Sequence, residues 1–194
     1  WFSTHVSSAE FATCRRLTTD ALSAARDLLR RADVLVLTLG TDRCYRLPDG
    51  RLVANCHKQP AATFTEHAAD VETLTSDLRR ALDSLRALRP ELQVVWTVSP
   101  YRYAKYGLHA SQLAKARLLL AVDALCATDE RSVYFPAYEL LLDELRDYRY
   151  YARDLLHPSD TAVELIGERF ADWCFAPALH TFAREKATSN ICTA

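Results

Sequence analysis

Continuous apolar runs alternate with helical segments along this chain, and that alternation limits the folds it can adopt. The runs cover residues 33–40, 92–98 and 132–135, and their apolar residues follow one another directly. Each run predicts a strand that is buried on both faces. Strands joined by helices form a mostly parallel sheet with right-handed crossovers. We therefore expect an α/β fold of three layers, with the sheet between two layers of helices.

Apolar residues at helical spacing predict the helices of this fold. We expect them at residues 19–32, 69–88, 111–127 and 137–147, with a last long helix from about Thr161. The Thr161/Glu164 spacing resembles a capping box. In the third helix we expect one face to point inward, namely Leu113, Ala116, Leu120 and Ala124. A hairpin is expected over 43–54, around the turn dipeptide Asp49-Gly50.

The length of 194 residues, 49% of them hydrophobic, suits one domain. We place it at residues 1–175, followed by a C-terminal helix (178–187) and tail within 176–194. The chain has no methionine and begins with Trp1. Together with a sheet of only three strands, this leads us to expect that an N-terminal segment, with the first strand, is missing.

Charge and cysteine content exclude several classes of protein. The formal net charge is −1, from 24 basic and 25 acidic residues, which gives no electrostatic case for a nucleic-acid or anionic-membrane partner. No apolar stretch approaches 18 residues, so no membrane span is expected. The six cysteines form no CxxC pair, and we expect free thiols in a reduced, cytoplasmic setting.

Ligands of open α/β sheets bind outside the carboxyl ends of the strands. Asp154 and His157 lie in the predicted loop before the last helix, and Pro158 biases His157 toward an extended backbone. Asp154 could accept the Nδ1 proton of His157 and leave Nε2 free to take a proton from a hydroxyl. The alternative is a structural pair at a helix N-terminus, where an acidic residue is favourable.

Further candidates follow the first strand. Gly40 could offer a backbone N–H to an oxyanion, or simply form a tight turn. Asn55 could supply an amide donor to the same oxyanion. Cys56 and His57 are adjacent, so in an extended segment their side chains point to opposite faces. A thiol nucleophile there stays open, but no third or fourth ligand has the spacing of a metal site, and we expect neither metal nor cofactor.

Weaker candidates for substrate binding are Ser99, Tyr101 and His57. Ser99 and Tyr101 follow the second strand, but Ser99 lacks the glycine-flanked turn that exposes a serine nucleophile and could simply cap the strand end. The run RDYRYYARD at 146–154 interleaves arginine and tyrosine. It could line a sugar- or carboxylate-binding groove or be a packed surface.

Five blocks in order resemble the GSCFA domain family. They read VLVLTLGT, VANCHKQPA, VVWTVSPYR, QLAKARLLLAVDAL and YFPAYELLLDELRDYRYYARDLLHPSD. The resemblance covers roughly residues 20–175. That family belongs to the SGNH (GDSL-like) hydrolase group, so the resemblance implies an SGNH or flavodoxin-like sheet.

The resemblance also implies roles for residues. SGNH enzymes carry an Asp-x-x-His pair close to their last helix, and Asp154 and His157 match it. Gly40 and Asn55 would correspond to the glycine and asparagine donors of the oxyanion hole. The Gly-Ser-Cys-Phe-Ala motif that names the family carries the nucleophile and is not in this chain. We expect the nucleophile to lie upstream of Trp1.

Three functional hypotheses follow. The first is a serine ester hydrolase or acyltransferase whose substrate is a small-molecule or glycan acyl ester. The second is a non-catalytic module that keeps the scaffold and binds glycan or protein. The third is that the 194 residues alone are inactive, with a sheet edge left open.

Overall fold

A computed structural model describes residues 8–53, 56 and 59–175. Three of the features predicted above lie outside the described residues. They are Asn55, His57 and the C-terminal helix at 178–187.

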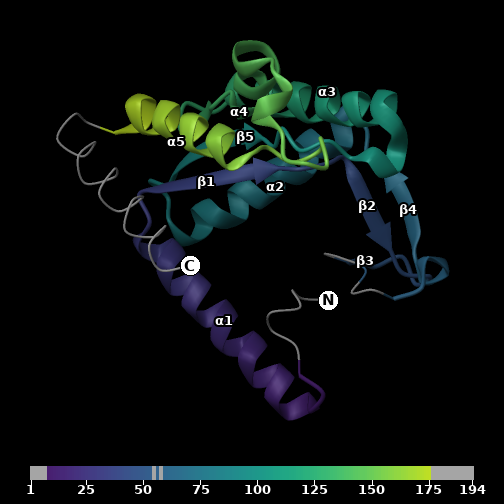
Figure 1. The fold of residues 1–194 in the computed structure, drawn as a ribbon. Coiled ribbons are helices and arrows are strands. Elements are labelled where there is room, and N and C mark those ends of the chain that lie inside the picture. Colours follow the sequence, from purple (N-terminus) through teal and green to yellow (C-terminus); the bar gives the residue numbers. More distant parts are fainter. Residues whose placement is uncertain (1–7, 54–55, 57–58, 176–194) are drawn as a thin grey trace.

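A parallel sheet forms the centre of the fold (Figure 1). The strands β1 (Val34–Leu39), β5 (Gln93–Val98) and β6 (Ser132–Tyr134) lie in the order β1-β5-β6. Both pairs are parallel, with Val34 opposite Gln93 and Val94 opposite Ser132. All three strands coincide with the apolar runs of the sequence. The predicted α/β class is therefore confirmed.

Helices pack on both faces of β5. On one face, α2 (Val71–Leu88) and α3 (Gly107–Cys126) contact the side chains of Val94 and Trp96. On the other face, Val95 packs with α4 (Ala137–Glu139), which continues as the π-helical turn η4 (Leu140–Leu145), and with α5 (Asp160–Cys174). Trp96 is the largest fully buried side chain and donates its indole N–H to the Ser132 hydroxyl. The core therefore lies on either side of β5.

The third of the predicted helices, α3, packs through a different face from the one predicted. Leu113, Ala116 and Leu120 are exposed, and Ala124 is half-buried. The buried residues of α3 are Ser111, Ala114, Lys115, Leu118, Ala121, Val122 and Leu125. Apolar residues occur all round this helix, so their spacing does not fix the buried face. The face that packs on the sheet includes a lysine.

The first strand, β1, is not buried on both faces as the sequence predicted. Its residues alternate between exposed and half-buried, and Val34 and Val36 are 49% and 45% exposed. Leu35, Leu37 and Leu39 pack against the α2 and α3 side. The residues packed on the opposite face come from β5, α4, η4 and α5, with Phe135 just after β6, and none of them comes from β1. Among the described residues, β1 pairs with β5 alone, so it is also an edge strand of this sheet.

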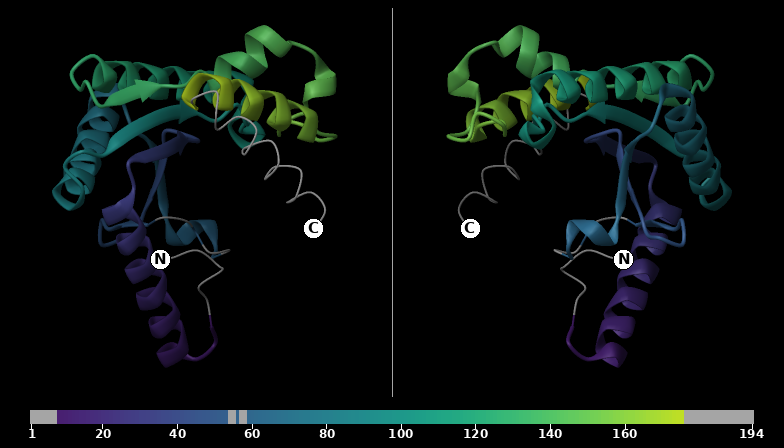
Figure 2. Two further views of the ribbon diagram at one scale, coloured as in Figure 1. Left: turned by 90° about the vertical axis from the view of Figure 1, so that its left-hand side faces the viewer. Right: turned by 90° about the vertical axis from the view of Figure 1, so that its right-hand side faces the viewer.

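The helix before this strand, α1 (Phe11–Arg31), begins earlier than predicted and extends away from the sheet (Figure 2). None of its residues is buried. Phe11, Leu22 and Leu28 are among its exposed apolar side chains.

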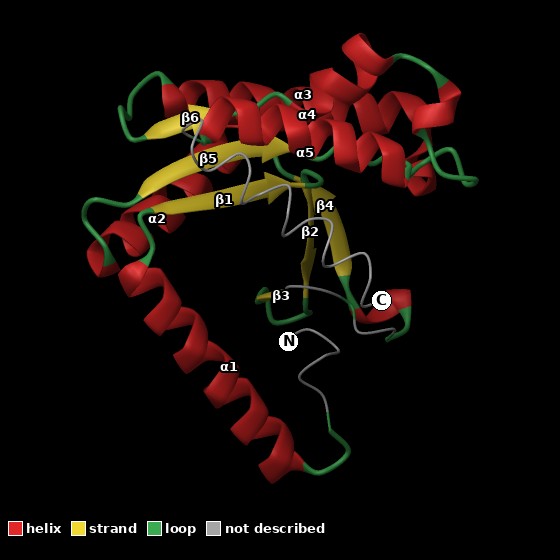
Figure 3. Ribbon diagram, turned by 60° about the vertical axis from the view of Figure 1, so that its left-hand side comes forward, coloured by secondary structure: helices red, strands yellow, loops and turns green. Residues whose placement is uncertain are grey.

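A second, antiparallel sheet follows β1. It consists of β2 (Arg43–Arg46), β3 (Leu52–Val53) and β4 (Thr65–Ala68), in the order β3-β2-β4. The predicted hairpin at Asp49-Gly50 is present, with Gly50 at φ +85°, whereas β4 was not predicted. Figure 3 shows this sheet descending from the ends of the β1 and β5 arrows. It therefore projects from the edge of the main sheet where a ligand site was expected.

The last helix, α5, begins one residue earlier than expected and with a different cap. Ser159 is the N-cap, and its hydroxyl accepts the backbone N–H of Ala162 at 3.3 Å. The predicted Thr161/Glu164 capping box is wrong, because Thr161 already lies inside the helix. The loop that ends at Ser159 carries Asp154 and His157.

Candidate functional site at the carboxyl ends of the strands

The segment that carries Asp154 and His157 is a closed loop. Tyr151 and Pro158 form an isolated antiparallel bridge. Inside it, the N–H of Ala152 donates to the carbonyl of His157 at 2.9 Å. The backbone of Leu155 adopts the left-handed region, with φ +58°. These bonds hold the two ends of the loop together, and we call residues 151–158 the relay loop.

Arg102, just beyond the end of β5, ties the relay loop to the sheet. Its backbone N–H donates to the carbonyl of Leu156 at 3.0 Å. Its guanidinium donates to the Tyr151 hydroxyl at 2.8 Å and lies 4.4 Å from the centre of that ring. Tyr151 is itself buried. The loop is therefore held at the carboxyl end of β5.

Within this loop, Asp154 and His157 are in direct contact. Oδ2 of Asp154 lies 2.5 Å from Nδ1 of His157. Oδ1 of the same carboxylate accepts the backbone N–H groups of His157 at 3.0 Å and Leu156 at 2.9 Å. The backbone bond from His157, then its ring and the N–H of Leu156, lower the pKa of Asp154 to about 2. The carboxylate is thus ionised and fixed toward the ring.

The other ring nitrogen of His157 is available for chemistry. A carboxylate at Nδ1 keeps the proton of the neutral imidazole on Nδ1, so Nε2 carries the lone pair. Among the described residues, no side chain forms a hydrogen bond with Nε2. The ring is exposed, and the ring of Tyr101 lies beside it, with the two ring centres 4.3 Å apart. This arrangement can accept a proton from a hydroxyl placed at Nε2.

Aromatic side chains connect the relay to the end of β1. Tyr101 meets Tyr103 edge-to-face, with ring centres 4.7 Å apart. Tyr103 then lies against Gly40, where an added Cβ would be 2.9 Å from the tyrosine hydroxyl. Ser99 accepts the backbone N–H of Tyr101 through its hydroxyl at 3.3 Å and so shapes this turn. The structure therefore brings Gly40, Ser99, Tyr101 and the relay pair to one edge of the sheet.

Two cationic side chains of α3 hold the segment that follows β1. Nζ of Lys115 donates to the carbonyl of Gly40 at 2.5 Å, and Arg117 donates to Oδ2 of Asp42 at 2.7 Å. Asp42 is completely buried. Its Oδ1 lies 3.5 Å from Nε of Arg43, close enough for an ion pair but not aligned for a hydrogen bond.

Sequence reasoning did not find Lys115, Tyr103, Arg102 or the Asp42–Arg117 pair. Lys115 did carry a signal, because it is a charged residue inside the apolar run LAKARLLLAV. Its burial depends on the face that α3 presents, which the sequence left ambiguous. The other contacts join residues that are about 50 to 75 positions apart in the chain.

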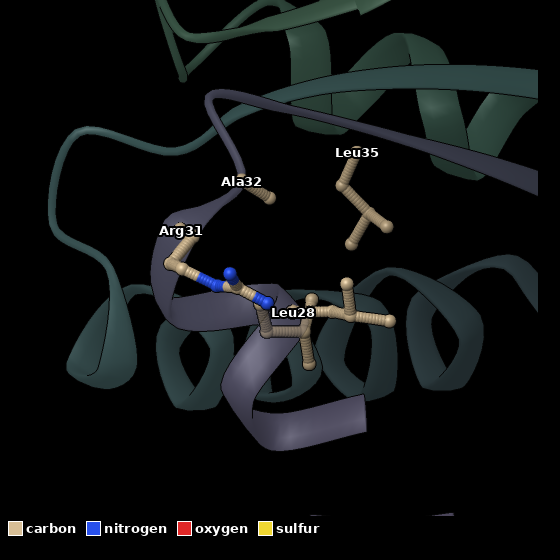
Figure 4. A pocket seen from close by; sticks show the side chains of 5 residues that line it. Leu28, Arg31, Ala32 and Leu35 are labelled. Atoms are coloured by element: carbon tan, nitrogen blue, oxygen red, sulfur yellow. The ribbon is translucent and has the colours of Figure 1, made fainter. Parts of the chain in front are cut away.

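Other features of the described part of the chain add no second site. Its side chains include no group of three or more that could ligate a metal, and none of its helices combines the length and apolar character needed to cross a bilayer. Cys44, Cys56, Cys126 and Cys174 are free thiols. An apolar hollow lies between α1 and the start of β1, lined by Leu28, Leu29, Arg31, Ala32 and Leu35 (Figure 4). It sits at the amino end of β1, opposite the relay.

A family model matches most of the chain. The model of the GSCFA family matches residues 1–170. The family resemblance that the sequence blocks indicated is therefore confirmed. No curated protein matches the chain.

Proposed function

The chain belongs to the GSCFA family. From the geometry of Asp154 and His157 we propose that it functions as a serine ester hydrolase or acyltransferase of the SGNH type. The observation that carries this proposal is the 2.5 Å contact between Asp154 Oδ2 and His157 Nδ1 at the carboxyl edge of a parallel sheet. His157 is the general base, and Asp154 holds its tautomer and orientation.

The proposed reaction proceeds in two steps. A serine hydroxyl loses its proton to Nε2 of His157 as its oxygen attacks the ester carbonyl. The tetrahedral intermediate then collapses, the acyl–oxygen bond breaks, and His157 returns the proton to the leaving alcohol. Water, or the hydroxyl of an acceptor, repeats the sequence on the acyl-enzyme. The carboxylate of Asp154 stabilises the imidazolium that forms in each step.

The backbone N–H of Gly40 is a proposed donor to the oxyanion. The absence of a side chain at Gly40 supports this, because it keeps the backbone accessible beside Tyr103. Asn55 remains a proposed second donor, as the resemblance implies. Ser99 is not the proposed nucleophile, since its hydroxyl accepts the Tyr101 N–H and no hydrogen bond joins it to His157 among the described residues. The nucleophilic serine is proposed to lie outside those residues.

The test is hydrolysis of p-nitrophenyl acetate by the natural full-length protein and by His157→Ala and Asp154→Asn. We expect each substitution to lower kcat by roughly 10²-fold or more, the range of general-base catalysis. Asp160→Asn is the matched control, because Asp160 is also an exposed aspartate beside the relay loop. Full turnover in His157→Ala would remove the basis of the proposal.

One observation favours the alternative of a glycan-binding module. Tyr148 is 70% exposed, and the Arg149 guanidinium lies 5.1 Å from the centre of the Tyr150 ring. Exposed tyrosines and arginines suit sugar recognition, since each tyrosine offers an apolar face with a polar tip. Glycan binding that survives His157→Ala but is lost in Tyr148→Ala would support this alternative. The reverse pattern would support the enzyme.

A further inference from the structure

Lys115 is a buried cation that pairs with no carboxylate in the described part of the chain. It is only 2% exposed, and no carboxylate among the described residues lies within ion-pair distance of it. Its polar contacts are the Gly40 carbonyl at 2.5 Å and the ring of Tyr103, whose centre lies 5.4 Å from Nζ. Removal from water disfavours a charged ammonium unless other interactions compensate. A lysine held in this way is a candidate for a role in function.

The Lys115 contact fixes one of two peptides that flank Gly40. The carbonyl of Leu39 accepts the N–H of Ser99 at 2.8 Å, and the carbonyl of Gly40 accepts from Lys115. In a trans peptide the N–H points opposite to the carbonyl. The N–H of Gly40 is therefore directed away from Ser99, and the N–H of Thr41 is directed away from Lys115. Neither N–H meets an acceptor in the described part of the chain.

We propose that Lys115 is a positioning residue for the reaction, fixing and polarising the Gly40–Thr41 peptide so that its N–H stabilises the oxyanion. This inference rests on the proposed function. A charged donor at the Gly40 carbonyl draws electron density through the amide and makes the Thr41 N–H a stronger donor. A preorganised donor of this kind acts on the charge that develops in the transition state.

Simple anchoring of this segment does not require Lys115. Arg117, two residues further along α3, already holds the connection between β1 and β2 through the buried carboxylate of Asp42. An apolar side chain at position 115 would also fill the space beneath Tyr103 without a buried charge. Unlike an apolar side chain, the ammonium of Lys115 donates a charged hydrogen bond to the Gly40 carbonyl. Burial lowers its pKa to about 8, so it is mostly protonated at neutral pH.

The test measures kcat and KM for p-nitrophenyl acetate in the full-length protein and in Lys115→Met, Lys115→Arg and Lys105→Met. We expect Lys115→Met to lower kcat roughly 10- to 10²-fold and to leave KM within about twofold, because the interaction is made in the transition state. Lys115→Arg retains the charge and should recover at least part of that loss. Lys105→Met is the matched control, since Lys105 is an exposed lysine paired with Glu66.

The outcomes separate this inference from the proposed function. If His157→Ala loses activity while Lys115→Met keeps the wild-type kcat, the role of Lys115 is wrong and the proposed function stands. A lower melting temperature, with equal losses of kcat in Lys115→Met and Lys115→Arg, would indicate a structural role and overturn the inference. A wild-type rate in His157→Ala overturns the proposed function and this role with it. Lys115→Arg gives the kcat readout if Lys115→Met does not fold.

Discussion

Replacing Lys115 by methionine should change the pH dependence of stability in a predictable direction. Burial lowers the pKa of Lys115 from 10.5 to about 8. By linkage, this difference means that the folded protein disfavours the charged ammonium by about 3 kcal/mol relative to the unfolded chain. Below pH 8 the lysine is charged in both the folded and the unfolded state, so the folded protein is destabilised by the full amount. Between pH 8 and 10.5 the unfolded chain binds the extra proton, so the stability of the wild type rises with pH.

Methionine at position 115 has no such cost, but it leaves the Gly40 carbonyl without its donor. A lost hydrogen bond of this kind costs about 1–3 kcal/mol, so the variant should be about as stable as the wild type, or more stable, at pH 7. The free energy of unfolding of Lys115→Met, relative to that of the wild type, should then fall by about 2 kcal/mol between pH 7 and pH 9.5. Tyr103 faces Lys115, but burial raises the pKa of its hydroxyl above the usual 10, so it stays neutral in this window. Asp42 remains paired with Arg117.

The assay is urea unfolding of both proteins at pH 7 and pH 9.5, followed by tryptophan fluorescence. Comparing the two proteins at each pH cancels titrations that they share. A stability difference that is the same at both pH values would contradict the idea of a desolvated ammonium at position 115. A variant that is several kcal/mol less stable at pH 7 would show that Lys115 mainly stabilises the fold.

Three further predictions concern neighbouring residues. Arg117→Met should lower the free energy of unfolding by about 3–5 kcal/mol, because it leaves the buried Asp42 carboxylate without its closest partner; an unchanged urea midpoint would contradict this. Gly40→Ala should lower kcat and reduce stability by about 1–3 kcal/mol, because the new methyl group displaces the Tyr103 hydroxyl, and a wild-type rate would exclude the close approach at Gly40. The carboxyl carbon of Asp154 should titrate near pH 2 by NMR, whereas a midpoint near 4 would show that the bonds from His157 and Leu156 do not form in solution.

Much of the sheet could be predicted from the sequence, because uninterrupted apolar runs mark strands directly. The contact between Asp154 and His157 could also be predicted, since the two residues are three positions apart and Pro158 constrains the backbone between them and α5. The two faces of β1 could not be predicted in the same way. Val34 and Val36 read as core residues, but their burial depends on whether another element covers that face.

The packing of α3 could not be predicted for a related reason. A helix with apolar residues on all sides offers several faces, and its tertiary contacts decide which one packs against the sheet. Here the buried face includes Lys115, a residue type that is rarely buried. The contacts of Lys115 with Gly40 and of Arg102 with Tyr151 join distant parts of the chain. Such contacts become visible only in the folded protein.

Covalent labelling by a fluorophosphonate tests whether His157 activates a serine, because this probe captures a serine only when a base activates it. The measurement is the labelling rate of the natural full-length protein, of His157→Ala and of the control His109→Ala, with the labelled residue located by mass spectrometry. We expect one labelled serine, a rate reduced roughly 10²-fold or more in His157→Ala, and an unchanged rate in His109→Ala. Labelling that is equally fast in all three proteins, or absent from the wild type, would contradict the role of His157 as the base.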